Sequence, residues 1–131
     1  MKLIFKPGDK KNYQKVVGKD DVAAFHGDTL HEVCSTFSLA RDFEWSSRLF
    51  FIEIKDDDEE GVGTFLSIDH KSPAFVGEAI IFTATIVKME KNELTCMIEA
   101  RIGSRLIATG TTGQKMLKKE RLKQLFTPPK A

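Results

Sequence analysis

The chain has 131 residues and a mass of 14.7 kDa, which is the size of one domain rather than two. Its composition, 41% hydrophobic and 30% charged, is ordinary for a folded protein and excludes a disordered or fibrous class. Twenty basic and nineteen acidic residues leave a formal charge of +1, so no strong field exists to attract nucleic acid. We therefore expect one domain over residues 1–131, with a short flexible tail over about 118–131.

The sequence also bears on the compartment. The apolar stretch at the start is too short for a signal peptide, and no run reaches membrane-spanning length, so we expect no membrane partner. Cys34 and Cys96 are far apart and form no CxxC pair. Free thiols in a cytoplasmic protein are therefore expected, rather than a disulfide.

The first 35 residues predict only short elements. A strand is expected near residues 11–17 and a shorter one at 2–5, with a turn signal between them. Over residues 19–35, the acidic pair Asp20 and Asp21 before an apolar stretch predicts one helical turn followed by a loop.

Residues 37–54 form the stretch that predicts a long helix. Apolar and small residues recur at spacings of three and four, and 18 such residues would span about 27 Å. The five consecutive acidic residues 56–60 oppose the negative end of the helix dipole and must end the helix. The apolar arc is wide, so we expect the helix to be covered on most of its sides. The residues of this arc are Ala40, Phe43, Ser47, Phe50, Phe51 and Ile54, widened by Leu39, Trp45 and Leu49.

Beyond residue 60 the hydrophobic period changes to two. The segment 93–102 alternates cleanly between apolar and polar residues, which is typical of a strand with one covered face. Strands are also expected at 61–70, 78–90 and 105–117. Two-residue turn signals at 91–92 and 103–104 separate the last three strands and predict an antiparallel meander. From residue 118 onward a short basic helix is expected, which Pro128 and Pro129 would stop.

The order of these elements predicts an α+β fold in which a curved antiparallel sheet wraps a long central helix. A sheet of so few strands has open edges, and two copies that pair edge to edge would cover one of them. We therefore expect a homodimer.

Glu44 is the unusual residue of the predicted helix, because it lies between Phe43 and Trp45 on the arc expected to be buried. A desolvated carboxylate has a raised pKa and can accept a proton or act as a nucleophile. Alternatively, Glu44 lies at the edge of the arc and pairs with Arg41 or Arg48 at helical spacing. The sequence supports both interpretations equally.

Two further residues carry candidate chemistry. His70 ends the strand predicted at 61–70, where a histidine can reach a cleft and titrate near neutral pH, although an idle loop histidine is the plainer interpretation. Thr36 follows Ser35 at the start of the helix, where capping is the common role of such residues. The free N–H groups there could instead form an anion site that a hydroxyl completes.

Metal and cofactor sites are not expected. His26 and His31 lack a nearby ligand set for zinc. The acidic run 56–61 imitates the start of a calcium loop, but its twelfth position is Ser67 rather than a glutamate. Phosphate-loop and nucleophile motifs are also absent from the sequence.

Taken together, these residues resemble the hot-dog fold thioesterases, in particular the branch similar to fluoroacetyl-CoA thioesterase. Thr36 stands eight residues before Glu44 and Trp45, and His70 follows Glu44 by 26 residues, before a glycine at position 77. This matches the Thr…Glu-Trp…His pattern of the family. The resemblance covers residues from about 10 to 117.

The resemblance implies a hot-dog fold and hydrolysis of an acyl thioester of coenzyme A or acyl carrier protein, at the interface of a homodimer or a dimer of dimers. Glu44 would attack the thioester carbonyl or activate water, and His70 would transfer protons. Thr36 would orient Glu44 or hydrogen-bond near the developing oxyanion. Within one straight helix, Thr36 and Glu44 would be about 12 Å apart. Either Thr36 lies in a loop that folds back over the helix, or the triad is completed across the dimer.

The sequence departs from the family pattern in two places. Gly27 and Leu30 stand where the fluoroacetyl-selective branch has an aromatic lid, so selectivity for fluoroacetyl is not expected. The last strand runs from Gly110 to Gln114 without the His-Glu-Arg-like run common in relatives. The alternative function is a non-catalytic hot-dog protein that binds acyl-CoA or another small ligand. A hydratase that uses Asp69 with its neighbour ranks last, because adjacent strand residues point to opposite faces.

Overall fold

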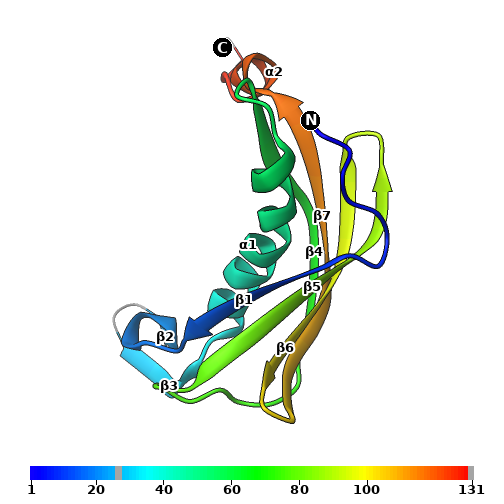
Figure 1. The fold of residues 1–131 in the computed structure, drawn as a ribbon. Helices are drawn as coiled ribbons and strands as arrows, with labels where there is room; N and C mark the ends of the chain where they lie inside the picture. The colour runs from blue at the N-terminus through cyan, green and yellow to red at the C-terminus, as the bar shows by residue number, and fades with distance from the viewer. Residues whose placement is uncertain (26–27, 130–131) are drawn as a thin grey trace.

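The structure is a computed structural model that describes residues 1–25 and 28–129, with the side chains of 23–25 and 28–31 not described. Figure 1 shows one long helix, α1, lying against one face of a curved sheet. The elements in chain order are β1 (Lys10–Val16), η1 (Lys19–Asp21), β2 (Val22–Phe25), β3 (Asp28–Cys34), α1 (Thr36–Ile54), β4 (Glu59–His70), β5 (Ala79–Glu90), β6 (Glu93–Ile102), β7 (Arg105–Lys118) and α2 (Lys119–Leu125).

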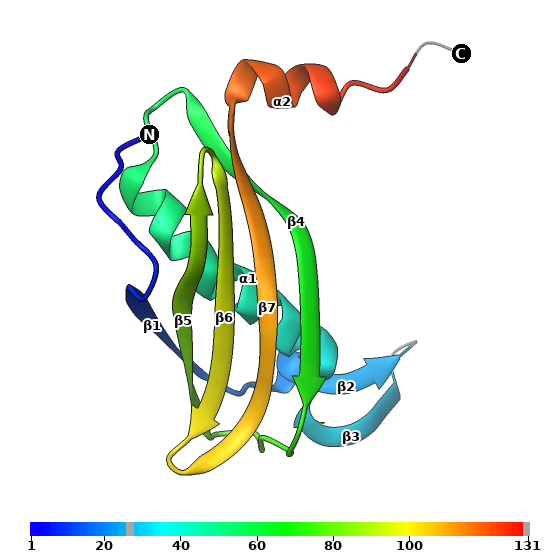
Figure 2. The same ribbon diagram turned by 90° about the vertical axis from the view of Figure 1, so that its right-hand side faces the viewer.

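The main sheet has five antiparallel strands in the order β1-β5-β6-β7-β4, which confirms the predicted meander of β5, β6 and β7. Gly103, the first residue of the second hairpin turn, has a φ of 59°, a left-handed conformation that glycine adopts without steric cost. The outer strands are β1 and β4, so β4 leaves one edge of this sheet open (Figure 2). A separate pair of strands, β2 and β3, lies beside the start of α1.

The helix α1 forms where the periodicity predicted it, one residue longer at its start. The side chain of Ser35 caps it by accepting the N–H of Ser38 at 3.0 Å, and the helix ends at Ile54, before the acidic run. Its sheet-facing side chains are fully buried, and burial of each contributes about 1.5–3 kcal/mol. The largest of them are Leu39, Phe43, Phe50, Phe51 and Ile54.

The expectation that α1 is covered on most sides is wrong for a single copy. A five-stranded sheet covers only one face of the helix, and the opposite face holds Phe37, Trp45 and Ile52 in solvent, with Trp45 43% exposed. These positions are spaced by seven or eight residues, which is two helical turns. The apolar arc therefore exceeds what one copy can bury.

Two expectations for the N-terminal part are also wrong. Residues 2–5 form no strand, and the N–H of Lys2 instead donates to the carbonyl of Ile54 at 2.8 Å. The predicted helical turn is η1, but β2 and β3 replace the loop expected after it. Their pairing has register shifts on either side of Ala23, which erase the period-two pattern that would have revealed them. His26 and Gly27 lie outside the described residues.

The strands predicted at 11–17, 61–70, 78–90, 93–102 and 105–117 are confirmed within two residues at each end. The basic tail forms the short helix α2, which extends past β4 at the end of the sheet where β4 begins (Figure 2). Among the residues described, no helix is long and apolar enough to cross a membrane.

Candidate active site

Thr36 and His70 meet where α1 begins and β4 ends. Thr36 Oγ1 lies 2.9 Å from His70 Nδ1, within hydrogen-bonding distance. The other ring nitrogen of His70, Nε2, is buried and has no hydrogen-bond partner among the residues described. The hydroxyl can therefore fix the tautomer and orientation of the imidazole, and Nε2 is left to act on a ligand.

Backbone hydrogen bonds hold the two residues at this distance. The N–H of Ser35 donates to the carbonyl of Asp21 at 2.7 Å, and the N–H of Cys34 donates to Ala74 at 2.8 Å. These bonds tie the start of α1 to η1 on one side and to the loop after β4 on the other. His70 itself lies opposite Ala108 of β7 in the ladder.

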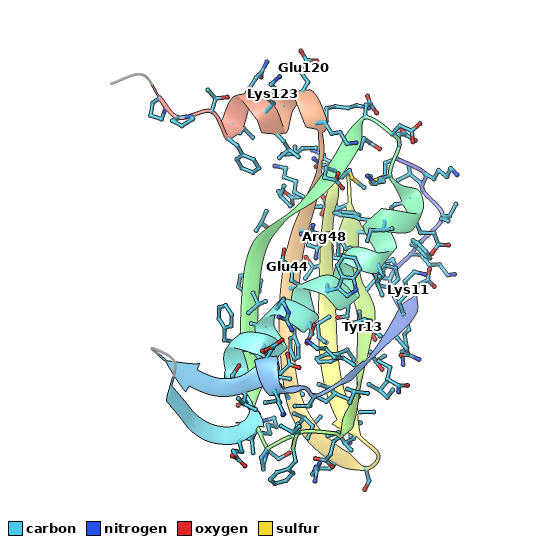
Figure 3. All side chains as sticks on the ribbon, turned by 90° about the vertical axis from the view of Figure 1, so that its left-hand side faces the viewer. Lys11, Tyr13, Glu44, Arg48, Glu120 and Lys123 are labelled. Atoms are coloured by element: carbon cyan, nitrogen blue, oxygen red, sulfur yellow. The ribbon has the colours of Figure 1, made fainter. Side chains whose placement is uncertain are left out.

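Glu44 lies two turns farther along α1. Its Oε1 accepts a hydrogen bond from a terminal guanidinium nitrogen of Arg48 at 2.7 Å, and its side chain is 47% exposed. Of the two interpretations, pairing at helical spacing is therefore the one found, and burial of Glu44 within a single copy is not. Figure 3 shows both side chains projecting from the same side of α1.

The carboxylate of Glu44 rests against β4 at Gly63. A Cβ at Gly63 would lie 2.8 Å from Glu44 Oε1 and 3.0 Å from Cδ, so the close approach requires a residue without a side chain. Around Glu44 the surface is hollowed over about 230 Å³, lined by Arg41, Glu44, Trp45 and Arg48.

Gln114 of β7 connects to this group and was not singled out by sequence reasoning. Its side chain is fully buried, and its Nε2 donates to the carbonyl of Glu44 and to Ser47 Oγ, both at 2.9 Å. Its Oε1 accepts from Arg48 Nε at 2.9 Å. Its position on the covered face of the strand predicted at 105–117 is the signal that could have identified it. A buried amide needs hydrogen-bond partners, so a glutamine at such a position indicates a polar contact in the core.

The three predicted residues form two separate groups in one copy. Thr36 is the first residue of α1, so the first of the two alternatives, a loop that folds back over the helix, is wrong. Thr36 and Glu44 are about 12 Å apart along the helix axis. Gly63, which touches Glu44, precedes His70 by seven strand residues, a separation of about 20 Å.

A larger hollow of about 490 Å³ lies near the Thr36 end of α1. It is lined by Lys19, Val22, Glu32, Phe75 and Val76. Its apolar part comes from the loop that follows His70 and from β2. Within the described part of the chain, no cluster of three His, Cys, Asp or Glu side chains could hold a metal ion.

A buried ionic cluster braces the same end of α1. Lys15 of β1 contacts Asp21 at 2.9 Å and Asp42 at 3.1 Å, and both carboxylates are buried. Burial alone would raise the pKa of Asp21, but the hydrogen bond from Gly18 N–H and the pairing with Lys15 outweigh it and lower the pKa. The cluster joins β1 and η1 to the helix that carries Thr36 and Glu44.

Comparison with known proteins agrees with this fold. A Thermus thermophilus hypothetical protein of the thioesterase superfamily superimposes with a TM-score of 0.89 at 26% identity, over 96% of this chain and 93% of that one. The fluoroacetyl-CoA thioesterase FlK superimposes with a TM-score of 0.85 at 19% identity, over 95% and 98% of the two chains. A hot-dog-like protein from Thermanaerovibrio acidaminovorans gives a TM-score of 0.80 at 18% identity, over 95% and 96%.

The last two similarities show the hot-dog fold, which confirms the predicted fold class. A search of curated proteins found no match. The family model described as fluoroacetyl-CoA-specific thioesterase matches residues 17–120, most of the chain. The chain therefore belongs to the fluoroacetyl-CoA thioesterase family of the hot-dog thioesterase superfamily.

Proposed function

We propose that the protein is a cytoplasmic single-domain thioesterase that hydrolyses an acyl thioester of coenzyme A or acyl carrier protein, at sites shared by two copies of the chain. The observation that carries the proposal is the contact of Thr36 with His70, which leaves the buried Nε2 of His70 without a partner among the described residues. Glu44 supplies the carboxylate from the same helix that begins at Thr36.

The open edge of β4 supports the pairing of two copies. Residues 63–67 are exposed on both faces of the strand, and they include Phe65, which is 56% exposed. Unpaired backbone groups beside exposed apolar side chains favour the addition of another strand. A second copy of β4, running antiparallel, fits this edge.

The register of such a pair of β4 strands explains why Glu44 lies far from the Thr36–His70 pair within one copy. An axis through residue 67, together with the extra residue of the bulge between Gly63 and Phe65, would place His70 of the partner subunit opposite Gly63. A bulge between Gly63 and Phe65 puts both Gly63 and His70 on the α1 face of the sheet, opposite Gln114 and Ala108. The Thr36–His70 pair of one copy would then face Glu44 of the other.

The chemistry follows from these positions. Glu44 takes a proton from water, and the resulting hydroxide adds to the thioester carbonyl; alternatively, the carboxylate adds directly, and water later cleaves the anhydride. Thr36 and the N-terminal N–H groups of α1 stabilise the oxyanion. Collapse breaks the C–S bond, and His70 protonates the leaving thiolate, so the products are a carboxylic acid and a free thiol.

Measurement of thiol release tests the proposal on short, medium and aromatic acyl-CoA substrates. We expect Glu44→Gln to lower kcat/KM by about 10²–10⁴-fold. Glu53→Gln is the matched control, because Glu53 is a half-exposed glutamate of the same helix, paired with Lys11. Equal rates for wild type and Glu44→Gln on every thioester would contradict the enzyme. Tight binding of acyl-CoA without turnover would establish the alternative, a ligand-binding hot-dog protein.

A further inference from the structure

We infer that Arg48 and Gln114 are positioning residues that hold the Glu44 carboxylate in its reactive orientation, in a space that Gly63 leaves free. The inference rests on the proposed function, since it gives Glu44 a reaction to perform. It adds two residues that lie outside the predicted triad of Thr36, Glu44 and His70.

The chain of contacts begins at Gln114, whose amide can adopt only one orientation. Its Nε2 donates to the carbonyl of Glu44 and also lies 2.9 Å from Ser47 Oγ. Its oxygen must therefore face Arg48, whose Nε donates to it at 2.9 Å. A flipped amide would place two donors against each other and leave a buried carbonyl without a partner.

Arg48, held by Gln114, in turn orients the Glu44 carboxylate. The guanidinium group is planar, so the bond from Nε to Gln114 fixes the direction of its other nitrogens. One of them donates to Glu44 Oε1 at 2.7 Å, a short charge-assisted hydrogen bond. Among the described residues Oε2 accepts no hydrogen bond, which leaves it as the oxygen that takes a proton or attacks the thioester.

Gly63 completes the arrangement from β4. It lies opposite Gln114 in the ladder, so both residues lie beneath the Glu44 side chain. A Cβ at position 63 would be 2.8 Å from Oε1 and 3.2 Å from Oε2, closer than van der Waals contact allows. The carboxylate therefore lies between Arg48 and the bare backbone of β4.

The charged groups around Glu44 identify its partner. In one copy, the charged side chains that line its hollow are Arg48 and Arg41 on α1, and Arg41 is already bound to Asp21. The sheet presents Gly63 and Gln114, neither of which ionises, and in the proposed dimer the partner subunit's His70 is added. Among the described residues, Arg48 is therefore the cation left to hold the Glu44 carboxylate.

Steady-state kinetics and NMR of the Glu44 carboxyl group test the inference together. We expect Arg48→Met to lower kcat by about 10–100-fold with a smaller change in KM, because the carboxylate loses its orientation. Arg48→Lys keeps the charge but not the planar guanidinium group, so it recovers only part of kcat. Gln114→Met also lowers kcat, and the double variant is no slower than Arg48→Met, because both residues act through one path.

The control is Arg101→Met, which breaks a similar 2.7 Å pair, with Glu99, at an exposed position of β6 and leaves activity unchanged. Carboxyl-carbon NMR of Glu44, assigned with Glu44→Gln, gives a readout that does not depend on turnover. At one fixed pH, we expect the carboxyl resonance of Glu44 to shift in Arg48→Met, which removes the 2.7 Å hydrogen bond, and to stay in place in Arg101→Met. An unchanged resonance together with an unchanged kcat in folded Arg48→Met overturns the inference. Failure of wild type to cleave any thioester overturns the proposed function instead.

Discussion

Thr36 and His70, 34 residues apart in the sequence, lie within hydrogen-bonding distance at the point where the long helix begins and the edge strand ends. A hydroxyl at a helix N-terminus and an imidazole at a strand end thus form one polar group beside backbone N–H donors. Glu44 lies two turns away in the same copy, and the proposed pairing of β4 strands would bring it to this group from the second copy.

The shared site makes a prediction for mixed dimers. Glu44→Gln and His70→Asn should each be inactive as pure dimers, and mixing them after unfolding and refolding together should restore activity. About a quarter of wild-type activity is expected, because half of randomly mixed dimers are mixed and each retains one intact site of two. Thiol release from acyl-CoA measures the recovery. Sites contained within single copies would show no recovery at any mixing ratio.

Gly63→Ala should lower kcat by about 10²-fold with little loss of stability. The added Cβ meets the far end of a half-exposed side chain, so Glu44 can move away, and displacement of its carboxylate by about 1 Å can cost 10²-fold in kcat. Gly18→Ala is the control, since a Cβ there would lie at an ordinary 3.6 Å from Asp21. Kinetics and thermal unfolding of both variants provide the measurement, and full activity in Gly63→Ala would contradict the tight approach.

The buried cluster around Asp21 predicts a loss of stability in acid. Because the pKa of Asp21 is lower in the folded than in the unfolded chain, its contribution is complete above the unfolded value of about 4 and disappears as the pH falls through the folded value. We expect Asp21→Asn to lower the free energy of unfolding by about 1–3 kcal/mol at pH 7. The same variant should reduce the dependence on pH below 4.

Chemical denaturation at several pH values measures the effect of Asp21→Asn. Asp69→Asn serves as its control, because Asp69 is 69% exposed and pairs only with Lys71 among the residues described. The control should change the free energy of unfolding by less than about 0.5 kcal/mol. Equal losses in the two variants would argue against a special role for the cluster.

Both cysteines should be inert in the folded protein. Burial raises the pKa of Cys34 to about 11 and that of Cys96 to about 12, so almost no thiolate exists at pH 8. A thiol reagent should label neither residue in native conditions and both after denaturation. Rapid labelling of the native protein would show that one of these segments opens readily.

Much of the fold could be predicted from the sequence, because the period of the hydrophobic pattern alone distinguishes α1 from the strands of the meander. The hairpin of β2 and β3 could not, since its register shifts around Ala23 leave no regular alternation. For the site, the spacing of Thr36, Glu44 and His70 gave the candidates. Their distances depend on where α1 starts and how the edge of β4 is covered, which no local pattern encodes.

The environment of Glu44 also depends on tertiary packing that no local sequence pattern encodes. Helical spacing allowed both burial and pairing with Arg48, and the width of the sheet decides between them. Gln114 was visible as a polar residue on a covered face, but its partners Arg48 and Ser47 come from a helix more than sixty residues earlier in the chain. A contact of that range is fixed by tertiary packing rather than by neighbouring residues.

The β-bulge between Gly63 and Phe65 has a consequence for insertions and deletions in β4. If Thr64 paired regularly with Gly113 instead of being accommodated in this bulge, the inside and outside of the strand would exchange for every position beyond it. Deletion of Thr64 should therefore give a regular ladder and keep the imidazole of His70 on the α1 face, opposite Ala108. The bulge thus decides whether this histidine belongs to the interior of the proposed assembly or to the solvent.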